Sequence, residues 1–371
     1  MKGKNGIDSI RLKKLFKALV DEYTPSGNEG PAIQILASFF QDAGIKPLFQ
    51  KVEEGRENLI LLPETVDPIL LFLGHVDTVT APDWDKFEWK EEGNRIEGLG
   101  TADMKGGCAA LAEAYISLLE EGISDLPFAL AFVVGEEESG DGTLKLLEDW
   151  QFSLAIVGEP SNLQPCFAHY GYIEAKVLVK GQRVHASVAP LGISPIAEIL
   201  YFLLAAVEYF KNRDEGIIYN FRDLRSSPSG FAVPDWCEVC IDIHIPPSLA
   251  PAPFLYDLEE LLESKKKNQP SLNARIDFTT VHEGYDLPHR GHFYEYIEEQ
   301  YQSLRLPFQP ASFQSHSDAA LLWHAGIRTV VLGPGMIEEA HRSGEGVEWN
   351  QIVTGSLLYR ELMKGSSKLL I

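Results

Sequence analysis

The sequence predicts an α/β fold, in which helices cover a mostly parallel sheet and a smaller α+β domain is inserted into the chain. Three observations predict this fold. Short runs rich in Leu, Ile, Val and Phe recur without alternation, as in strands that are buried on both faces of a parallel sheet. Helical stretches lie between these runs. A long central segment instead alternates apolar and polar residues. The length of 371 residues suits two domains.

The apolar runs are the expected strands of the first domain. They read PILLFLG from Pro68, PFALAFVVG from Pro127, LAIVG from Leu154 and TVVLGPG from Thr329. Apolar residues at helical spacing predict a helix near the N-terminus, and further helices are expected over 104–120 and 142–149. Strands and helices therefore alternate, as in a layered α/β protein.

The segment 172–285 has a different pattern. IEAKVLVKG, CEVCIDIHI and NARIDFTTVH alternate in polarity, and helical stretches lie near 195–212 and 253–265. This arrangement predicts an α+β domain with helices on one face of its sheet. The α/β pattern resumes with a helix over 292–304. We therefore expect the first domain to comprise 1–171 and 286–371, with the inserted domain between them.

Composition excludes several classes of protein. The formal net charge of −22 argues against binding to nucleic acids, which requires a concentrated basic surface, and against an anionic membrane surface. No secretory signal is recognisable, and no apolar run reaches the roughly 18 residues of a membrane span. The four cysteines are scattered, which fits a reducing compartment. We expect a cytoplasmic protein.

Histidines and carboxylates follow the ends of the expected strands. They are His75 with Asp77, Asp103 before the helix over 104–120, the triplet Glu136, Glu137 and Glu138, then Glu159, and finally His341. In open α/β sheets the ligand site lies at the carboxyl ends of the strands. These side chains are therefore expected to meet in one crevice.

Such a cluster is chemically costly without a cation. Carboxylates a few Å apart raise one another's pKa and destabilise the fold, and a pair of divalent ions would compensate their charge. Mixed imidazole and carboxylate ligands favour zinc or a neighbouring transition metal. Two ions about 3.5–4 Å apart would activate a water and polarise a carbonyl. We expect two Zn²⁺ per chain, with Co²⁺ or Mn²⁺ as possible substitutes.

The motifs resemble those of the co-catalytic zinc aminoacylases and carboxypeptidases, which include acetylornithine and acetyl-lysine deacetylases, succinyl-diaminopimelate desuccinylase and glutamate carboxypeptidase. The matching segments occur in the order of that family. They read LFLGHVDTV, IEGLGTADMKGG, VVGEEESGDG, IVGEPS, GQRVHAS and AHRSGEGVE. The resemblance implies a zinc-dependent hydrolase domain with an inserted lid and dimerisation domain.

The same resemblance implies a role for each site residue. His75 and Glu159 would hold one metal, Glu138 and His341 the other, and Asp103 would bridge both. Asp77 would accept a hydrogen bond from His75 and fix its tautomer. Glu137 would be the general base, which takes a proton from the bridging water and passes it to the leaving amine. His185, in GQRVHAS, would steady the oxyanion, usually from the partner subunit of a homodimer.

Two departures from the family pattern leave assignments open. Relatives usually read Asp-Glu-Glu-x-Gly. Gly140 sets the register used above, but a slip by one residue would make Glu136 the base and Glu137 the ligand. His244 stands where an arginine usually grips the substrate carboxylate, and Phe231 stands where an asparagine is usual. Arg183, Arg222 or Arg225 could replace the arginine, while Ser317 and Asp318 are candidates for substrate binding.

The function expected from these observations is hydrolysis of the amide bond of an N-acyl amino acid or short peptide. A dipeptidase or carboxypeptidase with the same site is the close alternative. A catalytically silent, metal-stabilised binding protein is a rival of another class, against which the complete ligand set and the base argue. The expected partners are a small-molecule substrate and a second copy of the chain, bound through the inserted domain.

Overall fold

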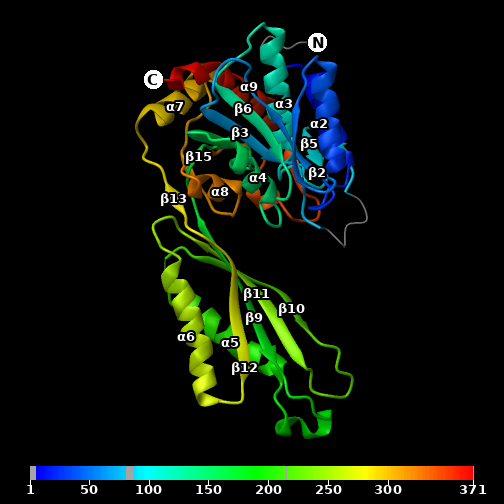
Figure 1. Ribbon diagram of the computed structural model, residues 1–371, viewed down its shortest axis with the longest axis vertical. Helices are drawn as coiled ribbons and strands as arrows, with labels where there is room; N and C mark the ends of the chain where they lie inside the picture. The colour runs from blue at the N-terminus through cyan, green and yellow to red at the C-terminus, as the bar shows by residue number, and fades with distance from the viewer. Residues whose placement is uncertain (1–5, 81–86, 214, 371) are drawn as a thin grey trace. The chain divides into compact units, whose positions relative to one another are not determined.

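The computed structural model describes residues 6–80, 87–213 and 215–370 (Figure 1). The chain divides into two compact units. The first comprises Met1–Phe167, Leu287–Phe313 and Ser317–Ile371, and the second comprises Ala168–Asp286 with Gln314–His316. The expected insertion is 172–285, so the second unit begins a few residues earlier. It also takes up a short segment, 314–316, that no sequence pattern indicates.

A mixed sheet forms the centre of the first unit. Its strands follow the order β1-β2-β6-β3-β7-β15-β8, and β14 pairs with β8. The pairs β3–β6, β3–β7 and β7–β15 are parallel, whereas β1–β2, β2–β6 and β8–β15 are antiparallel. The bounds are β1 Leu48–Glu53, β2 Arg56–Leu61, β3 Leu70–His75, β6 Phe128–Val133, β7 Leu154–Val157, β8 Cys166–His169, β14 Ala311–Phe313 and β15 Arg328–Val331.

Helices cover both faces of this sheet, which explains why its central strands are apolar without alternation. Leu71 and Leu73 of β3 pack in the core that includes α4 and α8. Phe72 between them contacts Tyr359 of α9, on the other face. On that face, α1, α2 and α3 contact one another, and α9 packs on α3. The bounds are α1 Ser9–Asp21, α2 Gly30–Asp42, α3 Lys105–Glu120, α4 Asp141–Asp149, α7 His292–Leu304, α8 Asp318–His324 and α9 Trp349–Gly365.

A small antiparallel sheet connects two distant loops of the first unit. It has the order β16-β5-β4, with β4 Lys90–Glu92, β5 Arg95–Glu97 and β16 Gly346–Glu348. Because β5 precedes Asp103 and β16 follows His341, this pairing ties together the loops that carry these residues. Short 3-10 helices lie at η2 Ile337–Glu339 and η3 Ser366–Leu370.

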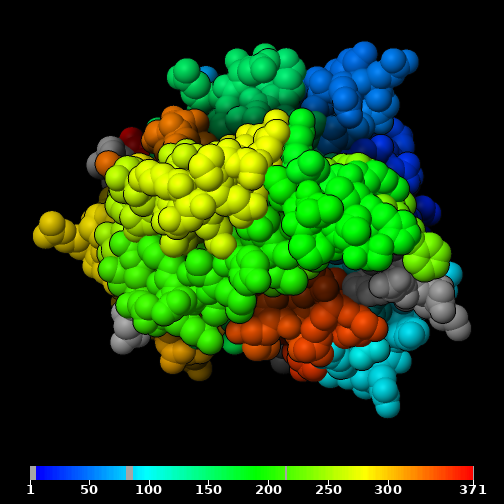
Figure 2. All heavy atoms as spheres, turned by 90° about the horizontal axis from the view of Figure 1, so that it is seen from below, coloured from blue at the N-terminus to red at the C-terminus, as the bar shows by residue number. Residues whose placement is uncertain are grey.

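The second unit is a single antiparallel sheet covered by helices on one face. The strand order is β10-β11-β9-β12. Alternate residues of β9 and β11, such as Val177 and Ile241, pack in one core with Phe202 of α5 and Phe254 of α6. The bounds are β9 Gly171–Lys180, η1 Ala186–Leu191, α5 Pro195–Lys211, β10 Ile218–Ser226, β11 Trp236–Ile245, α6 Ala252–Asn268 and β12 Asn273–His282. The two-residue strand β13, Tyr285–Asp286, lies outside this sheet and pairs with the end of β8. In the space-filling view, the yellow atoms of α6 lie beside green atoms of the same unit (Figure 2).

The predicted fold class is confirmed. The sheet of the first unit is parallel at its centre and is covered on both faces, and the central insertion has the alternating strands and one-sided helices that its sequence indicates. In the described residues, no helix is both long enough and apolar enough to cross a membrane.

Candidate metal centre

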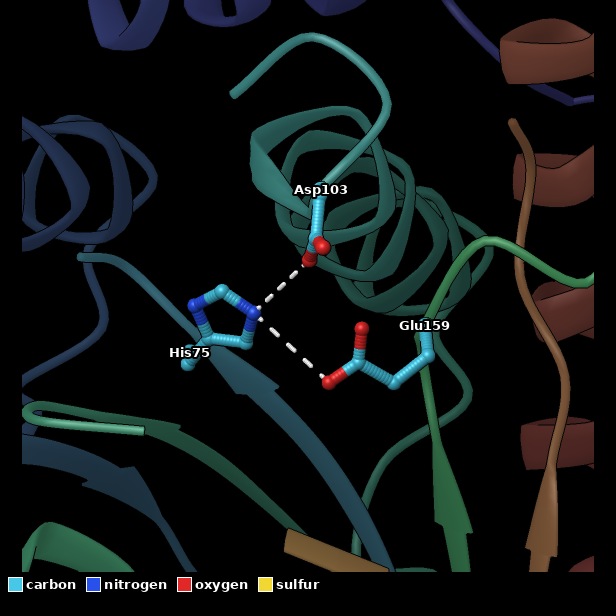
Figure 3. Close-up of side chains that lie close together, drawn as sticks. All are labelled: His75, Asp103 and Glu159. Carbon is cyan, nitrogen blue, oxygen red and sulfur yellow. Dashed lines mark hydrogen bonds and ion pairs between the residues drawn. The ribbon is translucent and has the colours of Figure 1, made fainter. Parts of the chain in front are cut away.

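The predicted site residues of the first unit lie at strand ends or in the loops beside them. His75 is the last residue of β3, Glu159 follows β7 by two residues, and Asp103 precedes α3. Figure 3 shows these three side chains pointing toward one another from a strand, a loop and the approach to a helix. Segments that are far apart in the sequence therefore supply a single cluster.

One group of possible ligands is formed by His75, Asp103 and Glu159. His75 Nε2 lies 3.0 Å from Asp103 Oδ1 and 3.6 Å from Glu159 Oε1. All three side chains are buried. Glu159 Oε1 is buried and accepts no hydrogen bond. A buried carboxylate oxygen that accepts no hydrogen bond is a candidate ligand for a cation.

A second group is formed by Asp103, Glu137 and His341. His341 Nε2 lies 3.0 Å from Glu137 Oε2 and 3.4 Å from Asp103 Oδ2. Asp103 thus turns one carboxylate oxygen toward each group. Asp103 therefore belongs to both groups of possible ligands.

The glutamate triplet differs from the register set by Gly140. The side chain of Glu138 is exposed and belongs to neither group, whereas Glu137 lies beside Asp103 and His341. Glu136 Oε2 lies 3.8 Å from His75 Nε2. Glu138 therefore does not lie with the cluster as expected, whereas Glu136 and Glu137 lie where the alternative register, which the sequence left open, would put the base and the ligand.

Local packing explains this register. The backbone N–H groups of Glu136 and Glu137 both donate to the Asp77 carboxylate, at 3.2 and 3.0 Å, which orients the turn after β6. Gly142 closes the turn, because a Cβ there would lie 2.2 Å from the Val134 carbonyl oxygen. Gly140 also needs to be glycine, because its φ is 63° and a Cβ there would lie 2.4 Å from Leu321 Cδ1, so Gly140 does not by itself set the register.

Asp77 lies beside His75 and makes more contacts than the single hydrogen bond expected from that imidazole. His75 Nδ1 lies 3.1 Å from the backbone carbonyl oxygen of Asp77 and 3.5 Å from its carboxylate. The closer partner of the ring is therefore the main chain. The carboxylate instead accepts from Ser26 Oγ at 2.7 Å and from the two N–H groups of the turn. Ser26 is a contact that sequence reasoning missed.

The electrostatics of the cluster are those of carboxylates crowded around two imidazoles. Burial raises the pKa of Glu136 and Glu159 well above the usual range, and for Glu159 the Asp103 carboxylate adds to this effect. Burial alone would lower the pKa of His75, but Glu159 and Asp103 raise it well above its usual value. The side chain of His341 is half exposed, and although partial desolvation opposes the rise, its pKa rises to about 11 beside Asp103 and Glu137. Positive charge is thus strongly favoured here.

Ser317 and Asp318 lie at the start of α8. Ser317 Oγ accepts from Ala319 N at 3.2 Å and so caps the helix. Asp318 is buried and accepts from Thr143 Oγ1 at 2.8 Å, while its Oδ1 has no hydrogen bond. Burial raises the pKa of Asp318 to about 7. The surroundings of Ser317 are those of a structural residue, whereas Asp318 retains a free acceptor.

His185 and His244 belong to the second unit. His185 is exposed at the start of η1, and its Nδ1 lies 2.8 Å from Ser187 Oγ. His244, on β11, has a buried Nδ1 without a hydrogen bond, and its ring centroid lies 5.2 Å from that of Tyr172. The arginines considered as replacements are all engaged within the unit: Arg183 with Asp235, Arg225 with Glu238, and Arg222 with Asp242, Glu174 and Asp223.

Sequence reasoning also missed Glu345. This buried carboxylate accepts backbone hydrogen bonds from the loop that ends at Asp103. Burial, followed by the charge of Asp103, raises the pKa of Glu345 to about 7, although the hydrogen bonds oppose the rise. A sequence signal exists, because Glu345 follows His341 by four residues in a glycine-containing turn.

Comparisons with known proteins agree with this architecture. The family model described as peptidase family M20/M25/M40 matches residues 71–365. An acetylornithine deacetylase of Vibrio parahaemolyticus is 28% identical over 351 residues, covering 88% of this chain and 90% of the relative. A tripeptidase structure from Staphylococcus aureus has a TM-score of 0.80 at 20% identity and covers 97% of this chain and 99% of its own. A dinuclear metal-binding peptidase from Bacillus subtilis has a TM-score of 0.66 at 15% identity and covers 96% and 97%.

Proposed function

Because the chain belongs to peptidase family M20/M25/M40, and is thus a hydrolase of amide or peptide bonds, we propose that it removes the acyl group from an N-acyl amino acid at a two-zinc centre. The observation that carries this proposal is the position of Asp103, which is shared by the two groups of possible ligands. A site with one shared carboxylate between two such groups suits a pair of ions.

The donor set fits two divalent transition metals. His75 and Glu159 would hold one ion, Glu137 and His341 the other, and Asp103 would bridge them. Imidazole combined with carboxylate favours zinc, and cobalt or manganese can occupy similar sites. Glu159 Oε1, which is buried and accepts no hydrogen bond, supports this fit. When bound, the ions would supply the positive charge that makes a water acidic and polarises the scissile carbonyl.

Glu136 is the general base in this proposal. Its carboxyl lies at the edge of the first group, 3.8 Å from His75 Nε2, and takes no part in either group of ligands. Burial and the neighbouring carboxylates raise its pKa, which makes it a better proton acceptor than an exposed glutamate. Glu136 would take the proton of the attacking water and deliver it to the leaving nitrogen.

The substrate class rests on the relatives and on the second unit. An acetylornithine deacetylase that covers 88% of this chain favours an N-acyl amino acid, while the tripeptidase and carboxypeptidase structures keep a short peptide as the alternative. Arg183, Arg222 and Arg225 already pair with carboxylates. A substrate carboxylate would therefore be held by a group other than these, and His244, with its unpaired Nδ1, is a candidate.

We also propose a homodimer formed through the second unit. Along α5, large apolar side chains are exposed at helical spacing, namely Ile196, Leu200, Tyr201 and Leu204. Such a stripe on the surface of a helix is typical of a contact with another chain. His185 would then be presented by one chain for use in the other.

The experiment that tests the function is a hydrolysis panel. Acetyl, succinyl and formyl amino acids and dipeptides would be supplied to protein that is loaded with zinc, and to the same protein after a chelator. Zinc-dependent release of acetate or succinate supports the deacylase. Faster cleavage of dipeptides than of acyl amino acids would indicate a peptidase instead. Turnover that is the same before and after chelation would contradict both the deacylase and the peptidase.

A further inference from the structure

Glu345 lies outside the two groups of possible ligands, yet it is almost completely buried. The residue is 1% exposed. It follows His341 by four residues and immediately precedes β16. A buried carboxylate must be compensated by hydrogen bonds or opposite charge, so its partners indicate what it does.

The loop that ends at Asp103 donates three backbone N–H groups to the Glu345 carboxylate. Ala102 N and Asp103 N lie 2.8 and 3.1 Å from Oε1, and Gly100 N lies 3.1 Å from Oε2. Both oxygens are engaged, and the backbone of Asp103 itself is one of the donors. The carboxylate therefore fixes the main chain from which the shared ligand projects.

The main chain on each side holds Glu345 in place. The N–H of Gly98 donates to the Glu345 carbonyl at 3.1 Å, and the N–H of Glu345 donates to the Arg342 carbonyl at 3.1 Å. The next residues, Gly346 to Glu348, pair with β5. Lys105 is buried close by, and its charge attracts Glu345. Glu345 is thus hydrogen-bonded to both the loop that ends at Asp103 and the loop that carries His341.

We propose that Glu345 is a positioning residue of the metal centre, which holds Asp103 and His341 at the separation that two ions require. The proposal rests on the proposed two-metal function. Asp103 Oδ2 and His341 Nε2 lie 3.4 Å apart, and each belongs to one of the loops that Glu345 connects. Loss of this connection would let the two ligands separate.

The test compares Glu345→Gln and Glu345→Asp with the control Glu348→Gln. Glu348 lies three residues further along the chain, and its exposed carboxylate accepts a hydrogen bond from Asn94 Nδ2. In Glu345→Gln, one carboxylate oxygen becomes an amide that cannot accept from an N–H, so at least one of the three bonds is lost. In Glu345→Asp, the charge remains but the side chain is one methylene shorter.

Metal affinity is measured on the metal-free chain by competition with a chromophoric chelator, and site geometry by the d–d absorption of the cobalt form. Outer groups that orient ligands typically contribute about 10–100-fold in affinity. We expect a loss of this size and an altered cobalt spectrum in Glu345→Gln, a smaller loss in Glu345→Asp, and no change in Glu348→Gln.

The outcomes separate this inference from the function on which it rests. A metal-free Glu345→Gln chain that melts lower but binds both ions with wild-type affinity and spectrum would show a purely structural role and overturn the inference. If that variant does not fold, wild-type affinity in Glu345→Asp would overturn it equally. Failure of the wild-type chain to bind two ions would instead overturn the proposed function.

Discussion

Three adjacent glutamates show how position decides the role of a residue. Glu136, Glu137 and Glu138 have the same chemistry, but the turn after β6 places the first two, whose side chains are only 9% and 6% exposed, beside the cluster and leaves the third exposed. The separation arises because Asp77 accepts from the N–H groups of both Glu136 and Glu137. A sequence pattern can identify the triplet, but the direction of each side chain depends on that turn.

The first prediction distinguishes the two registers. Glu136→Gln should keep its metals and lose about 10²–10⁴-fold in kcat, because the amide cannot accept a proton. Glu138→Gln is the matched control and should retain wild-type turnover, since its side chain faces solvent. Steady-state kinetics with parallel metal analysis measures both. A large loss in Glu138→Gln with normal turnover in Glu136→Gln would restore the register set by Gly140.

At the scale of elements, buried strands place the possible metal ligands at their ends, and glycines allow the loops beside them to pack closely against one another. The sequence predicted the strands around β3, β6, β7 and β15, because runs that are apolar on both faces have few alternatives. It also predicted His75, Asp103, Glu159 and His341 as members of one cluster. Reasoning from the sequence did not identify Glu345 or Ser26, because the contacts of both depend on hydrogen bonds between loops that are distant in sequence.

A second prediction concerns the glycine that closes the turn after β6. Gly142→Ala would place a Cβ 2.2 Å from the Val134 carbonyl oxygen and should destabilise the protein by about 1–3 kcal/mol. Gly30→Ala is the control, because its Cβ would meet only the Gly55 carbonyl oxygen at 3.8 Å. Chemical denaturation of the two variants measures the difference. Equal stability would contradict the packing described for Gly142.

A third prediction concerns pH and the histidine cluster of the second unit, which consists of His169, His244, His282 and His316. His282 Nδ1 and His316 Nε2 lie 2.8 Å apart. Burial lowers the pKa of His169 to about 4 and, together with the neighbouring imidazoles, that of His316 to about 3. Both values lie below the unfolded value of about 6.5, so the unfolded chain binds protons first as pH falls.

The stability contributed by these neutral histidines should therefore be present above about pH 6.5 and be lost progressively between about pH 6.5 and 3. Urea unfolding of the full chain at pH 7.5, 5.5 and 4.5 measures this loss as a decrease in the free energy of unfolding. His316→Gln should weaken the pH dependence, whereas His292→Gln, at an exposed histidine of α7, should leave it unchanged. The same pH dependence in all three proteins would exclude the histidine cluster as its cause.

At the scale of the whole molecule, the chain combines a unit that carries the candidate metal centre with an insertion that carries an exposed apolar stripe. The insertion could be predicted because its strands alternate apolar and polar residues. The short segment 314–316, which also belongs to the second unit, could not be predicted. The exposed apolar side chains of α5 indicate a contact surface, but they do not identify the chain that binds there. The homodimer is accordingly a proposal that solution measurements can test.

A fourth prediction tests that dimer. Light scattering should give about twice the 41.3 kDa of one chain. Leu204→Glu, at a side chain 66% exposed on α5, should yield a monomer because a charge cannot be buried in an apolar contact. Leu144→Glu, at a side chain 50% exposed on α4 of the first unit, should leave the mass unchanged. A wild-type monomer would contradict the proposal.

We propose above that the cluster around Asp103 holds two catalytic metal ions. The decisive experiment is metal analysis of the active protein, followed by chelation and stepwise return of zinc while turnover is recorded. We expect two zinc ions per chain, loss of turnover on chelation, and recovery as the second equivalent binds. Full turnover in protein shown to contain no metal would contradict it.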